Sequence, residues 1–544
     1  MTNPQRLRFA RRTIVILAAA SMMVISFGAE NAIAGGFHYP DHGTVALGRG
    51  GAFVARADDP TALYHNPAGA TQLRGTHVYI GGNLLLENVR FQRRIYYKDG
   101  LGNPLPIDRY PHDSSIRLPE IKNGDAPFLT PFLAITTDFG FLHKYNLVVM
   151  AGIYGPNSHN AHTFPRYCKP NTSPCVPTDA NDPTGIASPN RYDTVGTEVL
   201  VLYPSVGIAW EPIDGLSFGG VVQVGWSSLR YKTVISATPE EVPEGDIDVQ
   251  LDASSGATPT GILGVHWKAT DFLEFGASLR FGFTFKGRGK VCIGGYGEDG
   301  EGECKGIPES VYQRLAGGIP LHADPNPAAV SIEIPKQWIV RTGARYVHRD
   351  LRKREVFDIE LDFIWEQTSA LKAFNLKFDT PVEVKTEAGG SLFFPIEGMS
   401  VPHNWNDSWS LRLGGSYTFH DIVDDGALTL RTGVLYEARA APKQYSRLDF
   451  LPHQRVGISI GAGFSWGRYD FNIGYFHLFH ETHNVAPPAG APTCADGVTE
   501  PCGSEVRQVV PWASDGFGEA VGNGTYAMSI DEWTFSATVR FGDK

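Results

Sequence analysis

The stretch FDIELDFIWE, residues 357–366, decides the fold because its side chains alternate in polarity. Its odd-numbered positions are apolar, from Phe357 to Trp365, whereas Asp358, Glu360 and Asp362 occupy even positions. Successive side chains of a β-strand point to opposite faces, so this segment predicts a strand with one apolar and one acidic face. Long strands of this kind suit a barrel that has lipid outside and water inside.

The same alternation recurs along the chain. In residues 274–286, every odd position from Phe275 to Phe285 is apolar, and we expect all of them on one face. Residues 408–419 repeat the pattern, with Trp409 and Leu411 opposite Ser410 and Arg412. About fourteen such segments follow from the two-residue period, and they begin near residues 77, 126, 144, 196, 214, 257, 271, 331, 355, 405, 425, 453, 468 and 524.

The connections between these segments alternate in length. Five tight ones carry turn residues, at 211–215, 268–271, 348–355, 420–426 and 466–469, and long ones such as 156–195, 287–330 and 484–523 lie between them. Short turns at one end and long loops at the other are typical of outer-membrane barrels. The sequence therefore predicts an all-β membrane protein, a 14-stranded antiparallel transmembrane β-barrel with both termini in the periplasm.

The first residues predict export. Four arginines between residues 6 and 12 precede an apolar run from Thr13 to Gly28, and Ala32-Ile33-Ala34 offers a cleavage site. This arrangement is a secretory signal peptide. We expect three regions: a signal peptide over 1–34, a small plug over 35–76 and the barrel over 77–544.

Cysteines and charge agree with an exported protein. The six cysteines form three local pairs in the long polar loops, and none has the CxxC spacing of a zinc or redox site. In an oxidising compartment we expect three disulfides, namely Cys168 with Cys175, Cys292 with Cys304, and Cys494 with Cys502. The formal net charge of −11 argues against nucleic acid as a partner.

A compact segment precedes the first strand. In ADDPTALYHNPAGATQL, residues 57–73, Asp59 and Asn66 each stand before a proline. Asp and Asn cap helix starts with their side-chain oxygens, and proline suits the first helical position. The segment is therefore predicted to form a folded plug, the hatch of the barrel, with short helices, in which Asn66-Pro67-Ala68 fixes the shape.

Several stretches resemble one family. GGFHYPDHGTVALGRGGAFVARADDPTALYHNPAG, residues 35–69, is similar to the N-terminal hatch of the FadL-type long-chain fatty acid transporters of bacterial outer membranes. YPSVGIAWEPIDGLSFGGVVQ (203–223), SIEIPKQWIVRTGARY (331–346) and the stretch 405–440 resemble further strands of that family. The resemblance covers nearly the whole chain after residue 34, and the loops are its least similar part.

The resemblance implies a mechanism. Hydrophobic ligands enter from a groove in the outer loops, pass to an apolar pocket reached by the mature N-terminus, and leave sideways into the membrane near a kink in the third strand. In this scheme Phe37 contacts the cargo. The implied function is passive uptake of long-chain fatty acids or related hydrophobic compounds, without a catalytic residue or cofactor.

The pattern of strands two to four agrees with a hydrophobic cargo. Apolar residues occupy both faces of 128–135, 147–154 and 199–206, so this sector of the inner wall is apolar. Such residues either contact the ligand or pack against the hatch, and both interpretations stay open. Met150 and Tyr154 are candidate ligand contacts in this sector.

A fatty acid also needs a cation for its carboxylate, because charge-assisted hydrogen bonds are strong away from water. By resemblance, Lys372 and a basic residue of the fifth strand, Arg230 or Lys232, are candidates, although alternation places Arg230 in phase with Trp226 on the outer face. Alternation places Arg431 on the lumen side, which makes it a further candidate. We interpret Arg345 and Arg412 as structural partners of the inward acids.

Other functions remain as alternatives: a channel for aromatic hydrocarbons, an adhesin that uses the disulfide-closed loops, and a general diffusion porin. No nucleophile and base stand together in the way an enzyme requires. A metal site is not expected, because His477 and His483 share a strand face while His480 lies opposite. The expected partners are hydrophobic small molecules and the lipid and lipopolysaccharide of the outer membrane, and the chain is expected to be a monomer.

Overall fold

A computed structural model gives the fold of the chain. It describes residues 42–96, 115–155, 161–178, 185–236, 246–294, 304, 321–323, 328–380, 382–386, 391–394, 398–486, 504–509 and 517–542. The predicted signal peptide, Phe37 and the Cys494/Cys502 pair lie outside these residues.

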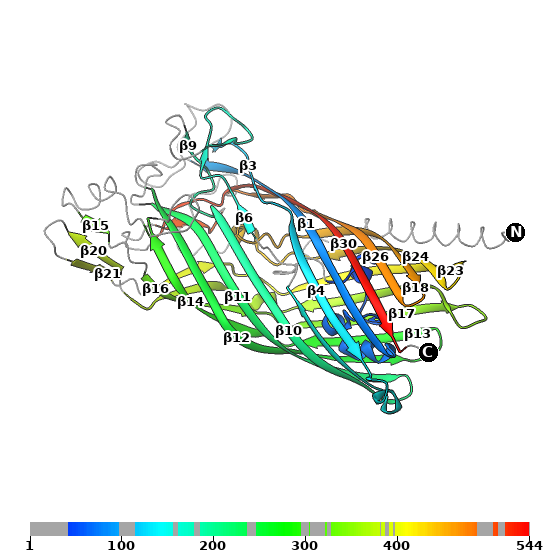
Figure 1. The fold of residues 1–544 in the computed structure, drawn as a ribbon. Helices are drawn as coiled ribbons and strands as arrows, with labels where there is room; N and C mark the ends of the chain where they lie inside the picture. The colour runs from blue at the N-terminus through cyan, green and yellow to red at the C-terminus, as the bar shows by residue number, and fades with distance from the viewer. Residues whose placement is uncertain are drawn as a thin grey trace.

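Fourteen antiparallel strands form one closed barrel, as the alternation predicts (Figure 1). The first strand pairs with the last over eighteen residue pairs, from Thr76 opposite Phe541 to Arg93 opposite Gly524. The strands are, in order, β1 (Thr76–Tyr96), β4 (Phe128–Thr137), β5 (Leu147–Tyr154), β10 (Gly196–Ile213), β11 (Leu216–Ser236), β12 (Asp246–Lys268), β13 (Leu273–Arg280) continued by β14 (Phe283–Ile293), β16 (Ala328–Lys336) continued by β17 (Ile339–Arg349), β18 (Glu355–Glu366) continued by β19 (Ala373–Phe378), β22 (Gly398–Pro402) continued by β23 (Ser408–Val423), β24 (Gly426–Glu437), β25 (Arg455–Trp466), β26 (Tyr469–His480) and β30 (Gly524–Phe541).

Shorter elements lie around the barrel strands. At the end with the long connections, β2 (Ser115–Arg117) and β3 (Ile121–Lys122) pair with β1, β6 (Ala161–Thr163) pairs with β10, and β27 (His483–Val485) pairs with β30. Three small sheets are separate, and they comprise β7 (Tyr167–Cys168), β8 (Pro177–Thr178) and β9 (Ile186–Ala187); β15 (Leu321–Ala323), β20 (Val382–Thr386) and β21 (Ser391–Phe394); and β28 (Arg507–Val509) with β29 (Phe517–Ala520). The 3₁₀ turns are η3 (Leu142–Tyr145), η5 (Thr368–Ala370) and η6 (Lys443–Tyr445).

The two faces of the wall follow the sequence pattern. On β18, Leu361 and Phe363 are exposed on the outside, whereas Asp358, Glu360 and Asp362 are buried in the interior. An apolar outer band with a polar interior is the arrangement that a barrel in lipid requires. Among the described residues, none of the helices is both long and apolar enough to cross a membrane.

The predicted alternation of tight turns and long loops is also confirmed. All five predicted tight connections lie between consecutive barrel strands at one end, the end that holds Phe541, the last residue of β30. The long connections lie at the other end, where Cys168 bonds to Cys175 and Cys292 bonds to Cys304. These two predicted disulfides are confirmed. By the rule for outer-membrane barrels, the short turns are periplasmic and the long loops extracellular.

The prediction for residues 274–286 is correct for only half of the segment. β13 ends at Arg280 and β14 begins at Phe283, so residues 281 and 282 interrupt the strand. The interruption reverses the alternation: Phe283 and Phe285, expected outside with Phe275, pack into the interior instead. Gly282 lies so close to Trp338 that a side chain there would overlap the indole ring. A second interruption, at residues 337–338 of the adjacent strand, faces this one.

The described residues of the third strand form two elements. β5 ends at Tyr154, and β6 begins at Ala161. On the neighbouring β10, residues 203–210 pair with β5 and residues 196–198 pair with β6. Within the described structure, residues 199–202 of β10 therefore have no partner from the third strand.

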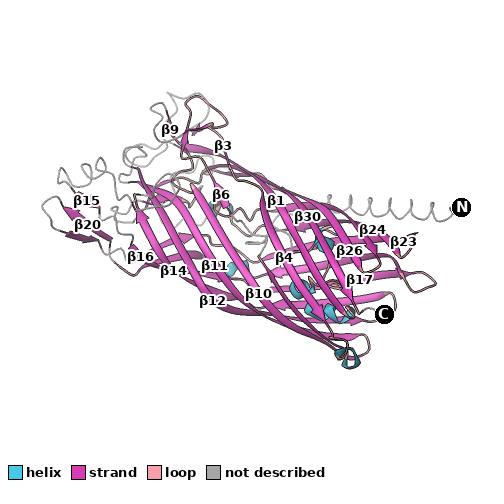
Figure 2. Cartoon of the chain, viewed as in Figure 1, coloured by secondary structure: helices cyan, strands magenta, loops and turns pink. Residues whose placement is uncertain are grey.

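A small helical segment lies inside the barrel, near the end that holds the C-terminus (Figure 2). It comprises α2 (Thr44–Leu47), α3 (Ala62–His65) and η2 (Pro67–Gln72). The cap predicted at Asn66 is present, since Asn66 Oδ1 accepts from the Ala68 amide at 3.2 Å at the start of η2. The prediction for Asp59 was wrong: its Oδ1 accepts from the Thr61 amide at 2.7 Å, but α3 begins after Thr61, whose side chain makes no capping bond. The Asn66 amide also donates to Val54 O and to Val265 O of β12, both at 2.9 Å. Asn66 therefore both shapes this segment and attaches it to the wall.

Candidate functional site

A buried arginine holds the hatch (residues 42–75 of the described chain) against one side of the wall. The Arg49 guanidinium contacts Asp358 at 2.7 Å and Glu360 at 3.0 Å, and all three side chains are fully buried. It also donates to Ser416 Oγ of β23. Charge-assisted bonds to two carboxylates are strong in a poorly solvated interior. The acidic face predicted for residues 357–366 thus serves to bind the hatch.

The same strand binds the hatch backbone. Asp362 Oδ2 accepts from the amides of Phe53 at 2.8 Å and Val54 at 3.0 Å, and Glu360 Oε1 accepts from the Ala55 amide at 2.6 Å. These bonds satisfy backbone donors that have no partner in a helix or sheet, which buried amides require.

A second arginine completes the network from the barrel side. Arg345 of β17 contacts Glu274 at 2.7 Å, Asp358 at 2.9 Å and Glu355 at 2.6 Å. This confirms the structural role that the sequence predicts for Arg345. Arg412 likewise contacts the hatch, with a 3.4 Å bond to Gly51 O.

The opposite side of the hatch meets an apolar wall, called here the apolar sector. It is built by β4, β5 and β10, the strands for which the loss of alternation predicts an apolar inner wall, and also by β1, β11, β12 and β14. Hatch and wall form one buried cluster there, so the interpretation as hatch packing is confirmed for these residues. The cluster consists of Ala57, Ala62, Leu63, Tyr64, Ala70 and Leu73 of the hatch and Tyr79, Phe132, Ala134, Val148, Met150, Tyr154, Val201, Tyr203, Ala209, Val221, Ile262 and Phe285 of the wall.

Aromatic rings gather at the third strand. The ring of His42 lies 5.3 Å from those of Tyr64 and Tyr154 and 5.5 Å from that of Phe132, measured between centroids. Phe132 and Tyr154 stack at 5.0 Å. Burial lowers the pKa of His42 to about 3, so its ring is neutral at physiological pH. The cluster therefore offers apolar surface and no positive charge of its own.

A buried cation, Arg280, borders this aromatic cluster. Arg280 ends β13, two residues beyond Ser278, whose hydroxyl donates to His65 O of the hatch at 2.7 Å. Its guanidinium carbon lies 4.6 Å from the centroid of the Tyr203 ring, and the residue is 2% exposed. Within the described residues, Nη1 and Nη2 of Arg280 have no hydrogen-bond partner, and no carboxylate forms an ion pair with them. A buried guanidinium of this kind is suited to an anion.

Comparison with known proteins identifies the family. The family model described as "Outer membrane protein transport protein (OMPP1/FadL/TodX)" matches residues 178–496, more than half of the chain. The chain belongs to the FadL/TodX family. A comparison with curated proteins gives no match.

Solved structures show the same fold as this FadL/TodX-family chain. A FadL homologue of Pseudomonas aeruginosa is 16% identical, with a TM-score of 0.63 over 93% of this chain and 100% of its own. The toluene transporter TodX of Pseudomonas putida is 13% identical, with a TM-score of 0.54 over 93% and 99%. The toluene transporter TbuX of Ralstonia pickettii is 14% identical, with a TM-score of 0.53 over 92% and 98%.

Membership of the FadL/TodX family determines the general class of the protein. The chain is a transport protein of the outer membrane and not an enzyme. The family takes up hydrophobic compounds, which agrees with the apolar sector.

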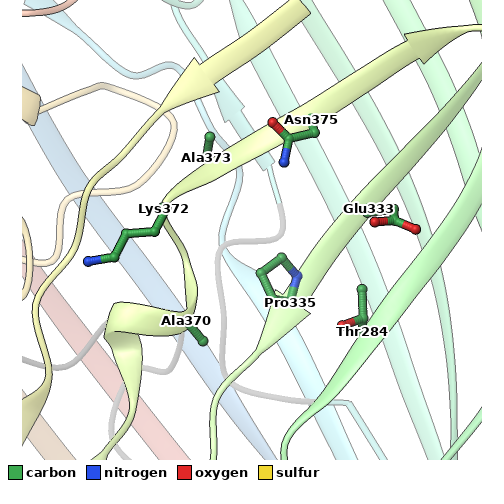
Figure 3. Close-up of a pocket in the computed structure, with 7 residues that line it drawn as sticks. All are labelled: Thr284, Glu333, Pro335, Ala370, Lys372, Ala373 and Asn375. Carbon is green, nitrogen blue, oxygen red and sulfur yellow. The ribbon is translucent and has the colours of Figure 1, made fainter. Parts of the chain in front are cut away.

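Two of the cations predicted from the resemblance, Lys372 and Arg230, are not buried in this FadL/TodX-family barrel. Lys372 is exposed, and its amine donates to Trp405 O at 3.0 Å. It borders a pocket of about 330 Å³ (Figure 3), together with Thr284, Glu333, Pro335, Ala370, Ala373 and Asn375. Glu333 points away from the interior, opposite buried Ile332. Arg230 contacts Asp252 at 2.8 Å and Glu198 at 3.5 Å on the outer face, in phase with exposed Trp226.

The other predicted contacts lie inside. Met150 and Tyr154 belong to the apolar sector. Arg431 faces the lumen, as alternation predicts, and lies beside Gly48 of the hatch and Gly463 of β25. Its Nε and Nη1 atoms have no hydrogen-bond partner among the described residues.

Arg280 was not among the predicted site residues, although the alternation of 274–279 places it on the polar face. In the structure, Arg280 is the last inward position before the interruption at Phe281-Gly282, which the sequence does not reveal. Its importance depends on Tyr203 and the hatch, which are distant in sequence.

Proposed function

We propose that this chain mediates the passive uptake of long-chain fatty acids, or of closely related amphipathic carboxylates, across the outer membrane. The observation that carries this proposal is Arg280, a buried guanidinium without an acidic partner at the edge of the apolar sector. A carboxylate there would form a charge-assisted pair, while the tail would lie along apolar and aromatic side chains.

The surroundings of Arg280 support a ligand with one charged end. Lys336 of β16 brings a second cation to the same region, with its amine 5.9 Å from the Phe285 ring centroid. Phe283, Phe285 and Tyr203 supply apolar surface between the two cations and the third strand. An aromatic hydrocarbon would use that surface and leave Arg280 unpaired.

The proposed route needs no energy source within the chain. The ligand passes from the outer loops to the apolar sector, and it leaves sideways into the membrane beside the third strand, at the end of β5 near Tyr154. We further propose that residues 1–34 are removed on export, that 35–76 act as the hatch, and that one chain suffices for transport. Phe37, Met150, Tyr154 and Arg431 remain proposed ligand contacts.

Uptake by cells distinguishes fatty acids from aromatic hydrocarbons. In a host that lacks its own transporter of this family, expression of this chain should restore uptake of radiolabelled oleate at low concentration. Uptake of radiolabelled toluene should stay near that of cells with an empty vector. Restoration of toluene uptake without oleate uptake would contradict the proposal and favour the hydrocarbon alternative.

A further inference from the structure

An exposed basic patch covers the extracellular extension of the first strand. Arg90 and Arg94 of β1 point outward, because the alternate residues Val89, Phe91 and Arg93 are buried. β3 and β2 place Lys122 and Arg117 beside them, and β3 lies next to the upper part of β1 (Figure 1). These four residues, Arg90, Arg94, Arg117 and Lys122, are called here the basic patch.

The register of the patch places like charges directly opposite each other. Arg90 pairs with Lys122, and Arg94 pairs with Arg117, in antiparallel register. Like charges in directly opposed positions destabilise a sheet. An anion bound between them would remove that repulsion.

The described chain supplies no such anion for three of the four cations. Within the described residues, Arg90, Arg117 and Lys122 form no ion pair and no side-chain hydrogen bond. By contrast, Arg230, also on the outer wall of this end, contacts Asp252 and Glu198. Arg90, Arg117 and Lys122 are therefore cations without an acidic partner within the described residues, whereas Arg230 has two.

The height of the patch suits the headgroups of the outer leaflet. Leu86 is the last exposed apolar residue on the outer face of β1, and Arg90 and Arg94 follow four and eight residues later. At about 3.3 Å per residue these positions lie roughly 13 and 26 Å along the strand beyond Leu86. The strand tilt of about 40° reduces these heights to about 10 and 20 Å. Both positions lie on the extracellular side of the exposed apolar residues of β1.

We propose that the basic patch binds the phosphate groups of the phosphorylated glycolipid of the outer leaflet, lipopolysaccharide. The chain lies in an outer membrane, where this lipid presents phosphates to the outer wall of a barrel. Four cations in two opposed pairs complement the charge of two phosphates, and arginine binds phosphate oxygens with a planar fork. The proposal is independent of fatty acid transport, because the patch faces away from the lumen.

The test measures binding of fluorescent lipid A to the purified full chain in a neutral detergent. In Arg90→Glu/Lys122→Glu, binding should weaken at least about 30-fold, because each cation near an anionic lipid surface contributes about 5-fold. The matched control is Lys144→Glu/Lys268→Glu, which makes the same change in charge at the periplasmic end and should bind like the unaltered protein. Equal affinity of the patch variant and the unaltered protein would overturn the proposal.

Further experiments distinguish lipid A from free phosphate as the ligand, and they distinguish loss of binding from loss of the fold. Dephosphorylated lipid A should bind equally weakly to both proteins, and millimolar inorganic phosphate should not displace intact lipid A. Displacement by phosphate alone would show an unspecific anion site and would contradict the assignment. The neutral variant Arg90→Gln/Lys122→Gln relieves the repulsion, so it should lose lipid A binding while its unfolding temperature in detergent stays the same or rises. Oleate binding should be unchanged in every variant.

Discussion

Substitution of Arg280 by glutamine should weaken oleate binding by about 10- to 100-fold, because hydrogen bonds to charged groups contribute about 1.5–3 kcal/mol. The residue keeps a polar side chain of similar length, and the fold should persist because Arg280 has no ion pair within the described residues to lose. Binding of oleyl alcohol, which has the same tail without the carboxylate, should change less than about 3-fold. Tryptophan fluorescence titration of the purified protein measures both ligands.

Two matched variants make the Arg280 result specific. Lys372→Gln removes an exposed cation that donates to Trp405 O, and Arg230→Gln removes a cation already paired with Asp252. Both should bind oleate like the unaltered protein. If Lys372→Gln weakened oleate binding and Arg280→Gln did not, the carboxylate would bind at Lys372, and the assignment to Arg280 would be wrong.

Substitution of Arg49 by glutamine should release the hatch. The change leaves Glu360 without its arginine and removes one of the cations on Asp358, both in a buried site. Breaking a buried ion pair from one side costs about 3–5 kcal/mol, and the lower value applies because Arg345 and Arg56 still contact Asp358. The barrel should persist, since its strand pairing does not depend on Arg49.

Release of the hatch has two direct readouts. In planar lipid bilayers, Arg49→Gln should conduct ions measurably, whereas the unaltered protein should conduct little. Limited proteolysis should cleave the variant between residues 50 and 75. Arg74→Gln, which changes an exposed arginine at the end of the hatch, is the control and should behave like the unaltered protein. An Arg49→Gln barrel that stays closed to ions and resistant to protease would contradict the role of the buried network.

The barrel could be predicted from the sequence because its two environments impose opposite chemistry on alternate residues. Leu361 faces lipid and Glu360 faces the hatch, and the change from an acidic to an apolar residue is visible in the sequence itself. The cap at Asn66 could also be predicted from the sequence, because capping is an interaction between residues that are close in the chain. The acids of β18 were predicted to face inward, but their partners on the hatch lie about three hundred residues away in the chain.

The interruption of the seventh strand could not be predicted from alternation. Phe281-Gly282-Phe283 continues the two-residue period without a break, and the reversal depends on Trp338 from the next strand. The same applies to the site cations. Lys372 follows the family pattern in sequence, yet its side chain is exposed and its amine donates to Trp405 O, while Arg280 gains its role from Tyr203 and the hatch.

Photolabelling with a fatty acid tests the central claim most directly. A long-chain acid with a diazirine on the second or third carbon from the carboxylate should, on irradiation with the purified protein, label peptides of β10, β13 and β14 near Tyr203, Arg280 and Phe285. Excess oleate should abolish this labelling, and excess toluene should not. Labelling confined to residues 370–375, or equal protection by toluene, would contradict a carboxylate site at Arg280.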